Sequence, residues 1–131
     1  MKAVVHIQLV EDYQELPFQT EFHQFVSTEF QEVEFFELDN FSEPEMISYA
    51  WEMIQRTTLI LLVVESRSGQ AYPGKLIRLF NQIVKEKPAH LQIVLLGKHP
   101  VIEKIAKPLA NQFRPILDRQ QLEQIATDLL S

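Results

Sequence analysis

The residues LILLVV, 59–64, are the strongest indication of the fold of this 131-residue chain. All six residues are apolar, so a strand made from them has no polar face. Such a strand has to be covered on both sides, as in the middle of a parallel sheet with helices in front and behind. A polar segment, residues 65–74, follows, and apolar residues at helical spacing resume at Leu76. Because ligands bind beyond the carboxyl ends of strands in open α/β sheets, we expect a binding site at this segment.

Four further segments have the composition of β-strands, and amphipathic helical patterns separate them. The strands are expected at residues 2–10, 33–38, 91–96 and 113–117, and the helices within residues 18–26, 46–54, 76–84, 102–109 and 122–129. This alternation predicts one α/β domain, residues 1–131, with three layers and a doubly wound five-stranded parallel sheet. Right-handed crossovers leave few strand orders, of which 2-1-3-4-5 places the most apolar strand in the middle.

Capping residues and prolines predict where several of these elements begin and end. Ser42 followed by Glu45 forms a capping-box pattern ahead of the second helix, and Asp118 is a candidate cap for the last one. Pro108 is expected to end or kink the fourth helix. Pro115 has no amide donor, which places the last strand at an edge of the sheet.

The second helix carries two large aromatic residues, Tyr49 and Trp51. Its buried face is expected to consist of Met46, Tyr49, Ala50, Met53 and Ile54. We expect Tyr49 and Trp51 to pack in the core or at its edge. An aromatic side chain that stays exposed on this helix would instead indicate a surface for a protein partner.

The composition excludes several functional classes. A net charge of −6 and a pI near 5.2 argue against nucleic acid as the main partner, because phosphate neutralisation needs clustered Lys and Arg. The chain has no cysteine, so it forms no disulfide, thiolate metal site or thiol nucleophile. No signal peptide opens the sequence, and its longest apolar run is far below the roughly 20 residues that a membrane span needs. We therefore expect a cytoplasmic protein with no membrane partner.

Polar segments follow the first, third and fourth predicted strands, whose carboxyl ends meet at one edge of the sheet, the rim. The candidate ligand-binding residues on this rim are Glu11, Asp12, Tyr13, Glu65, Ser66, Arg67, Ser68, Gly69, Tyr72, Gly97, Lys98 and His99. His6, inside the first strand, and His23, on the first helix, are expected to be structural.

Two reactive arrangements can be drawn from the rim residues, and neither is favoured. Glu11 and Asp12 offer oxygen ligands that suit Mg²⁺, but the same acids are typical of a solvated loop before a helix, and no third acid is placed beside them. Ser66, His99 and Glu11 could form a nucleophile, base and acid, but no G-x-S-x-G elbow accompanies them. We expect no metal site, and the catalytic residues of an enzyme, if it is one, are unknown.

From residue 33 onward the chain resembles the flavodoxin-like superfamily, especially its NADPH-dependent FMN reductase branch. Leu38-Asp39 ends the second strand ahead of the loop Ser42-Glu43-Pro44, and residues 68–76, SGQAYPGKL, are similar to the family's tyrosine- and glycine-containing loop and helix start. The resemblance implies a flavodoxin-like fold, bound FMN and NAD(P)H oxidoreductase activity. It also suggests a homodimer. The candidate contact patch consists of Tyr72 and Ile77, an apolar residue that lies off the buried face of the third helix. We do not expect this patch to form a stable dimer interface.

Two departures from the family pattern alter the functional expectation. The family's first loop uses Ser, Thr and Gly to surround the FMN phosphate, whereas residues 11–15, EDYQE, contain three carboxylates and no glycine. Glu65-Ser66-Arg67 replaces the family's Pro-x-Tyr. We therefore expect poor FMN binding and a diverged, non-catalytic protein that binds a partner or a small ligand at the rim. The alternative is an FMN-dependent oxidoreductase that lacks the usual phosphate loop.

A second resemblance is to response-regulator receiver domains, which share the strand order. Val10-Glu11-Asp12 is similar to their acidic pair, and Phe113-Arg114-Pro115 to their Lys-Pro before the last helix. The phosphate-accepting aspartate should end the third strand, where Val63-Val64 stand instead. This resemblance implies at most a pseudo-receiver signalling domain.

Overall fold

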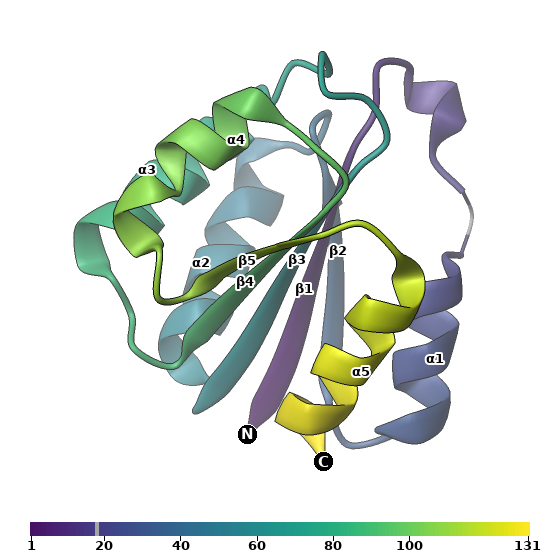
Figure 1. Cartoon of the computed structure of the whole chain (residues 1–131). Coiled ribbons are helices and arrows are strands. Elements are labelled where there is room, and N and C mark those ends of the chain that lie inside the picture. Colours follow the sequence, from purple (N-terminus) through teal and green to yellow (C-terminus); the bar gives the residue numbers. More distant parts are fainter. Residues whose placement is uncertain (18) are drawn as a thin grey trace.

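The computed structural model describes residues 1–17 and 19–131, which form a β-sheet between two layers of helices (Figure 1). The strands are β1 (Lys2–Leu9), β2 (Glu34–Asp39), β3 (Leu59–Ser66), β4 (Leu91–Leu96) and β5 (Phe113–Ile116). The helices are α1 (Glu21–Glu29), α2 (Pro44–Arg56), α3 (Leu76–Glu86), α4 (Pro100–Ile105) and α5 (Arg119–Leu130), with short 3-10 turns η1 (Tyr13–Glu15) and η2 (Lys107–Leu109). Phe18, expected on the apolar face of the first helix, lies outside the described residues.

All neighbouring strands run parallel, in the order β2-β1-β3-β4-β5. This is the predicted order, and with helices alternating between the strands it is the flavodoxin-like topology. β3 pairs with β1 on one side and β4 on the other, and residues 60–64 have no exposed surface. The expectation drawn from the apolar stretch is confirmed. Pro115 lies in the edge strand β5, also as expected.

The sheet has a separate apolar core on each face. Helices α2, α3 and α4 cover one face, and α1 and α5 cover the other (Figure 1). Because strand side chains alternate, Ile60, Leu62 and Val64 of β3 belong to the first core, and Leu61 and Val63 to the second. Both faces of β3 are therefore covered by helices, which explains the absence of a polar face from the stretch.

The start and the buried face of α2 differ from the expectation. The helix begins at Pro44 after Glu43, and the Ser42 hydroxyl accepts a hydrogen bond from the Asp39 amide instead of capping the helix. The Pro44 ring sets the first turn, so the capping-box assignment of Ser42 was wrong. Ile47, Ala50, Met53 and Ile54 form the buried face, while Met46 and Tyr49 are exposed. Ile47 therefore takes the place on the buried face that was expected for Met46 and Tyr49.

Other boundaries lie close to the expected ones. β3 continues two residues beyond the apolar stretch, so Glu65 and Ser66 belong to the strand and not to the following loop. Asp118 caps α5 by accepting a hydrogen bond from the Gln121 amide at 2.8 Å. Helix α4 ends at Ile105, before the η2 turn that contains Pro108. The cap of α5 and the end of α4 are both confirmed.

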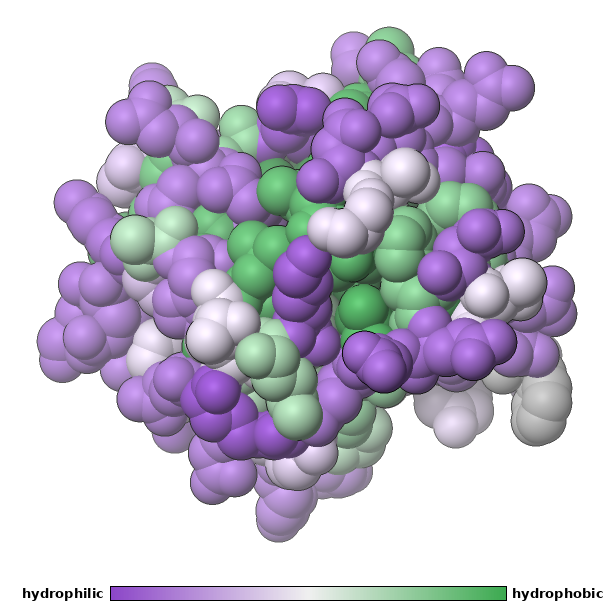
Figure 2. All heavy atoms as spheres, turned by 90° about the horizontal axis from the view of Figure 1, so that it is seen from below, coloured by the Kyte–Doolittle hydropathy of each residue, from purple (hydrophilic) through white to green (hydrophobic). Residues whose placement is uncertain are grey.

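The strands begin at the edge of the sheet opposite the rim. Figure 2 shows this end of the molecule, where apolar side chains lie near the middle of the surface. Met1, which precedes β1, is one of the exposed large apolar residues. Within residues 1–17 and 19–131, no helix combines the length and the apolar character that crossing a membrane requires.

Candidate functional site

Hydrogen bonds draw together the connections that follow β1, β3 and β4. The Ser68 hydroxyl donates to Oε1 of Glu11 at 2.9 Å, and the Ser66 hydroxyl donates to the Lys98 carbonyl at 2.8 Å. Gly69 lies against the same carbonyl, since a Cβ there would be 3.2 Å from the Lys98 oxygen. These rim residues lie side by side, and their polar groups mainly hold the loops to one another.

His99 and Gly97 also support the loops. The buried His99 ring accepts a hydrogen bond from the Ile102 amide at Nδ1, which fixes the proton on Nε2, and Nε2 donates to the Ala71 carbonyl at 2.7 Å. His99 thereby caps α4. Gly97 has φ +96°, and a Cβ there would lie 2.7 Å from the Ser66 oxygen, so only glycine fits the turn. Ser66 and His99 bond to other partners and not to each other, so these two residues and Glu11 do not form the Ser-His-acid arrangement drawn from the sequence.

Glu65 is the centre of an ionic cluster beneath the rim, in which Glu65 and His6 are buried and Arg67 and Arg119 are each 34% exposed. Its Oε1 lies 3.2 Å from Nε2 of His6, and its Oε2 lies 3.2 Å from Nη2 of Arg67 and 3.8 Å from Nη2 of Arg119. Burial raises the pKa of Glu65, but the hydrogen bond from His6 and the attraction of His6, Arg67 and Arg119 outweigh it and hold that pKa below its usual value. The cluster links β1, β3 and α5. Because the Glu65 carboxylate is paired with His6, Arg67 and Arg119, it is not free to bind a ligand.

The loop after β1 uses its own carboxylates to bind its backbone amides. Asp12 accepts a hydrogen bond from the Gln14 amide at 2.9 Å, and Glu15 accepts one from the Asp12 amide at 2.8 Å, which together cap η1. The Val10 amide donates to the side chain of Asn40. A phosphate held at this loop would need several of these amides. The residues present therefore do not fit the FMN phosphate in the manner of the flavodoxin-like family.

A pocket of about 600 Å³ opens on the rim beside β1, β2 and β3. Its lining residues are Val10, Glu11, Asn40, Phe41, Ser42, Tyr72, Gly74, Lys75 and Arg78. Asn40 organises it, because its Nδ2 donates to the carbonyls of Val10 and Tyr72, each at 2.8 Å. Asn40 thus links the connections that follow β1, β2 and β3. It was not among the candidate residues predicted from the sequence.

Of the twelve candidate residues, Glu11 and Tyr72 line this rim pocket, and Tyr13 packs edge-on against Phe41 with ring centroids 6.0 Å apart. Phe41, Lys75 and Arg78 were missed. Gly74 offered a signal, since its φ of +61° marks a tight turn just before α3 that brings Lys75 and Arg78 to the rim.

Comparisons with protein-family models, with curated proteins and with solved structures give no match for this chain. The flavodoxin-like topology therefore rests on the strand order and the alternation of helices. Among residues 1–17 and 19–131, no group of three or more His, Asp or Glu side chains is arranged to hold a metal ion.

Proposed function

We propose that this chain is a diverged, non-catalytic member of the flavodoxin-like topology that binds a small organic anion in the rim pocket. The observation that carries the proposal is the combination of exposed aromatic rings with two cationic side chains around a pocket of about 600 Å³. That volume lies in the range of ordinary small-molecule sites. The position, beyond the carboxyl ends of the strands, is the usual ligand site of open α/β sheets.

The aromatic rings favour a ligand with a flat apolar part. Phe41 is 46% exposed and Tyr72 is 75% exposed, although both are large side chains that gain from leaving water. Each lines the pocket, on connections that follow β2 and β3. A flat ring system placed against them would bury apolar surface on both partners.

The charged groups favour an acidic substituent on that ligand. Lys75 and Arg78 line the pocket. The Nζ atom of Lys75 lies 4.0 Å from the exposed carboxylate of Glu43. Arg78 forms no ion pair within the described part of the chain. Glu11 is the acid of the lining, and its carboxylate accepts a hydrogen bond from Ser68. A carboxylate or sulfonate on the ligand would find two cations available.

Neither alternative activity gains support from the rim. A flavin oxidoreductase needs a place for the FMN phosphate, and the amides of the first loop are bound to Asp12, Glu15 and Asn40. A receiver domain would present its phosphate-accepting acid at the end of β3, whereas Glu65 at that end is buried against His6. The binding proposal uses groups that remain accessible.

Anilinonaphthalene sulfonate, an aromatic anion whose fluorescence rises on burial, tests the proposal. We expect saturable binding of one dye per chain at pH 7. Tyr72→Ala and Lys75→Ala should each weaken binding by about two- to tenfold, the range for loss of one aromatic or charged contact.

Leu117→Ala is the matched control, because Leu117 is equally exposed, at 73%, but lies after β5 and outside the pocket lining. It should leave the dye affinity unchanged. Absence of saturable binding would overturn the proposal, as would affinities that Tyr72→Ala and Lys75→Ala leave intact. Circular dichroism of each variant confirms that the fold is retained.

A further inference from the structure

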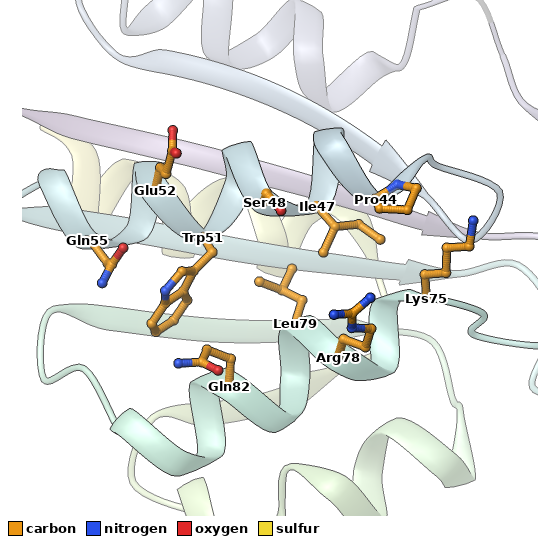
Figure 3. A pocket seen from close by; sticks show the side chains of 10 residues that line it. All are labelled: Pro44, Ile47, Ser48, Trp51, Glu52, Gln55, Lys75, Arg78, Leu79 and Gln82. Carbon is orange, nitrogen blue, oxygen red and sulfur yellow. The ribbon is translucent and has the colours of Figure 1, made fainter.

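A groove of about 520 Å³ runs between α2 and α3 (Figure 3), and it shares Lys75 and Arg78 with the rim pocket. Ile47 of α2 and Leu79 of α3 face each other between the helices, and the ring of Trp51 reaches from α2 toward Gln82 of α3. Ile47 and Leu79 are buried, whereas Trp51 is only partly covered. The groove therefore has an apolar floor that one large apolar side chain could extend.

One end of the groove is cationic. Lys75 and Arg78 line it near the start of α3, close to Pro44 at the start of α2 (Figure 3). Arg78 belongs to none of the ion pairs formed among residues 1–17 and 19–131, and the contact of Lys75 with Glu43 is a long and exposed one. In a chain of net charge −6, this cationic end complements a single carboxylate placed beside it.

Amide side chains stand on both walls at the other end. Gln55 projects from α2 and Gln82 from α3, on either side of the Trp51 ring (Figure 3). Amides of this kind bond the backbone of a peptide whose own N–H and C=O groups are free, which is true of an extended chain and not of a helix. The walls thus suit an extended peptide.

We propose that the α2–α3 groove docks an extended peptide segment of a partner protein, with an acidic side chain at Lys75 and Arg78 and a large aliphatic side chain on Trp51, Ile47 and Leu79. Pro44 and Trp51 are seven residues apart on α2. At about 1.5 Å per helical residue and about 3.3 Å per extended residue, the two anchors are about three peptide residues apart. The groove shares Lys75 and Arg78 with the rim pocket, but its floor of Trp51, Ile47 and Leu79 is separate from the pocket's aromatic wall.

A synthetic peptide with the sequence Leu-Leu-Ser-Glu-Ser-Leu-Leu, blocked at both ends, is the probe. Its central glutamate has leucines at equal spacing on both sides, so either chain direction can place one on the groove floor. Trp51 is the only tryptophan of the chain, so tryptophan emission reports on the groove alone. We expect a saturable shift of that emission to shorter wavelength as the indole ring leaves water.

Two paired variants test the location. Ser48→Arg places a bulky cation on the groove lining and should abolish the shift. Ser27→Arg makes the same change at an exposed position of α1, on the opposite face of the sheet, and should leave it intact. Thermal unfolding of both variants shows whether the fold is kept. A shift that survives Ser48→Arg in a folded protein overturns the proposal.

The charge contact is tested by a double-mutant cycle between the peptide and the protein. Arg78→Ala, and glutamine in place of the peptide's glutamate, should each weaken binding by up to about fivefold, and the two losses should not add. Additive losses, or no saturable shift with the wild-type chain, overturn the proposal. A shift that appears without peptide as protein concentration rises would assign the groove to a second copy and overturn it too. Dye binding by Tyr72→Ala tests the small-molecule proposal separately, because Tyr72 lines only the rim pocket, whereas Lys75 and Arg78 line both sites.

Discussion

At the scale of single residues, the alternation of strand side chains decides the environment of each polar group. Val63 and Glu65 project to the same face of β3, and β3 extends far enough for α5 to cover Glu65. The carboxylate then meets His6 of β1 and two guanidinium groups. The other ring nitrogen of His6, Nδ1, makes no hydrogen bond to a described residue. Glu65 is thus a structural acid that stabilises the charged network around it.

Replacing Glu65 with glutamine tests this role. Because the folded-state pKa of Glu65 is lowered, the ionised carboxylate stabilises the fold above the unfolded pKa of about 4.3, and this contribution is lost as the pH falls through the folded pKa. Glu65→Gln should lower the free energy of unfolding by about 1.5–3 kcal/mol at pH 7, and by less in acid. Urea unfolding at several pH values measures the difference. Exposed Glu45→Gln is the control, and an equal loss at every pH would contradict the assignment.

At the scale of elements, the connection between β1 and α1 departs most from the flavodoxin-like pattern. It rises above the sheet after β1 and forms η1, and α1 begins at Glu21 (Figure 1). The acids of residues 11–15 were expected to repel a phosphate. The structure adds that Asp12 and Glu15 also cap η1 and so occupy amides of the loop. Two physical effects, charge and amide occupancy, therefore oppose phosphate binding at this element.

FMN titration separates the two effects. The wild-type chain should be colourless when purified and should not quench FMN fluorescence at micromolar concentrations. Glu11→Gln with Asp12→Asn removes two negative charges and keeps the oxygen acceptors, so any weak binding should strengthen by up to about fivefold per charge and stay weak overall. Riboflavin, which lacks the phosphate, is the control ligand. Micromolar FMN binding by the wild-type chain would contradict this expectation.

At the scale of the whole molecule, the candidate dimer patch is small. Tyr72 is strongly exposed at the rim, but Ile77, the other residue of the candidate dimer patch, is partly covered by its neighbours. A stable interface usually buries about 800 Å² on each partner, far more than one tyrosine provides. The homodimer that the flavodoxin-like resemblance suggests would need a further surface.

Sedimentation equilibrium at micromolar concentration should accordingly give a mass near the 15.3 kDa of one chain. A mass twice as large would contradict this prediction. In that event Ile77→Asp and Tyr72→Ala distinguish the interfaces: a dimer that both variants abolish uses the candidate patch, and one that neither affects lies elsewhere.

Local patterns of apolar residues predict the architecture, whereas the packing of the folded chain determines which polar residues are free to bind. Apolar periodicity is a local property, so residues 59–64 and the alternating patterns around them were enough to give the sheet order and the layers. Hydrogen-bond partners are not local: Glu65 meets His6 across 59 positions, and Asn40 meets Tyr72 across 32. Because of such distant contacts, the candidate residues Glu65 and His99 are buried in the fold, whereas Lys75 and Arg78 stay exposed beside Tyr72. Only the folded chain brings these residues together, because each contact depends on how the helices and strands pack.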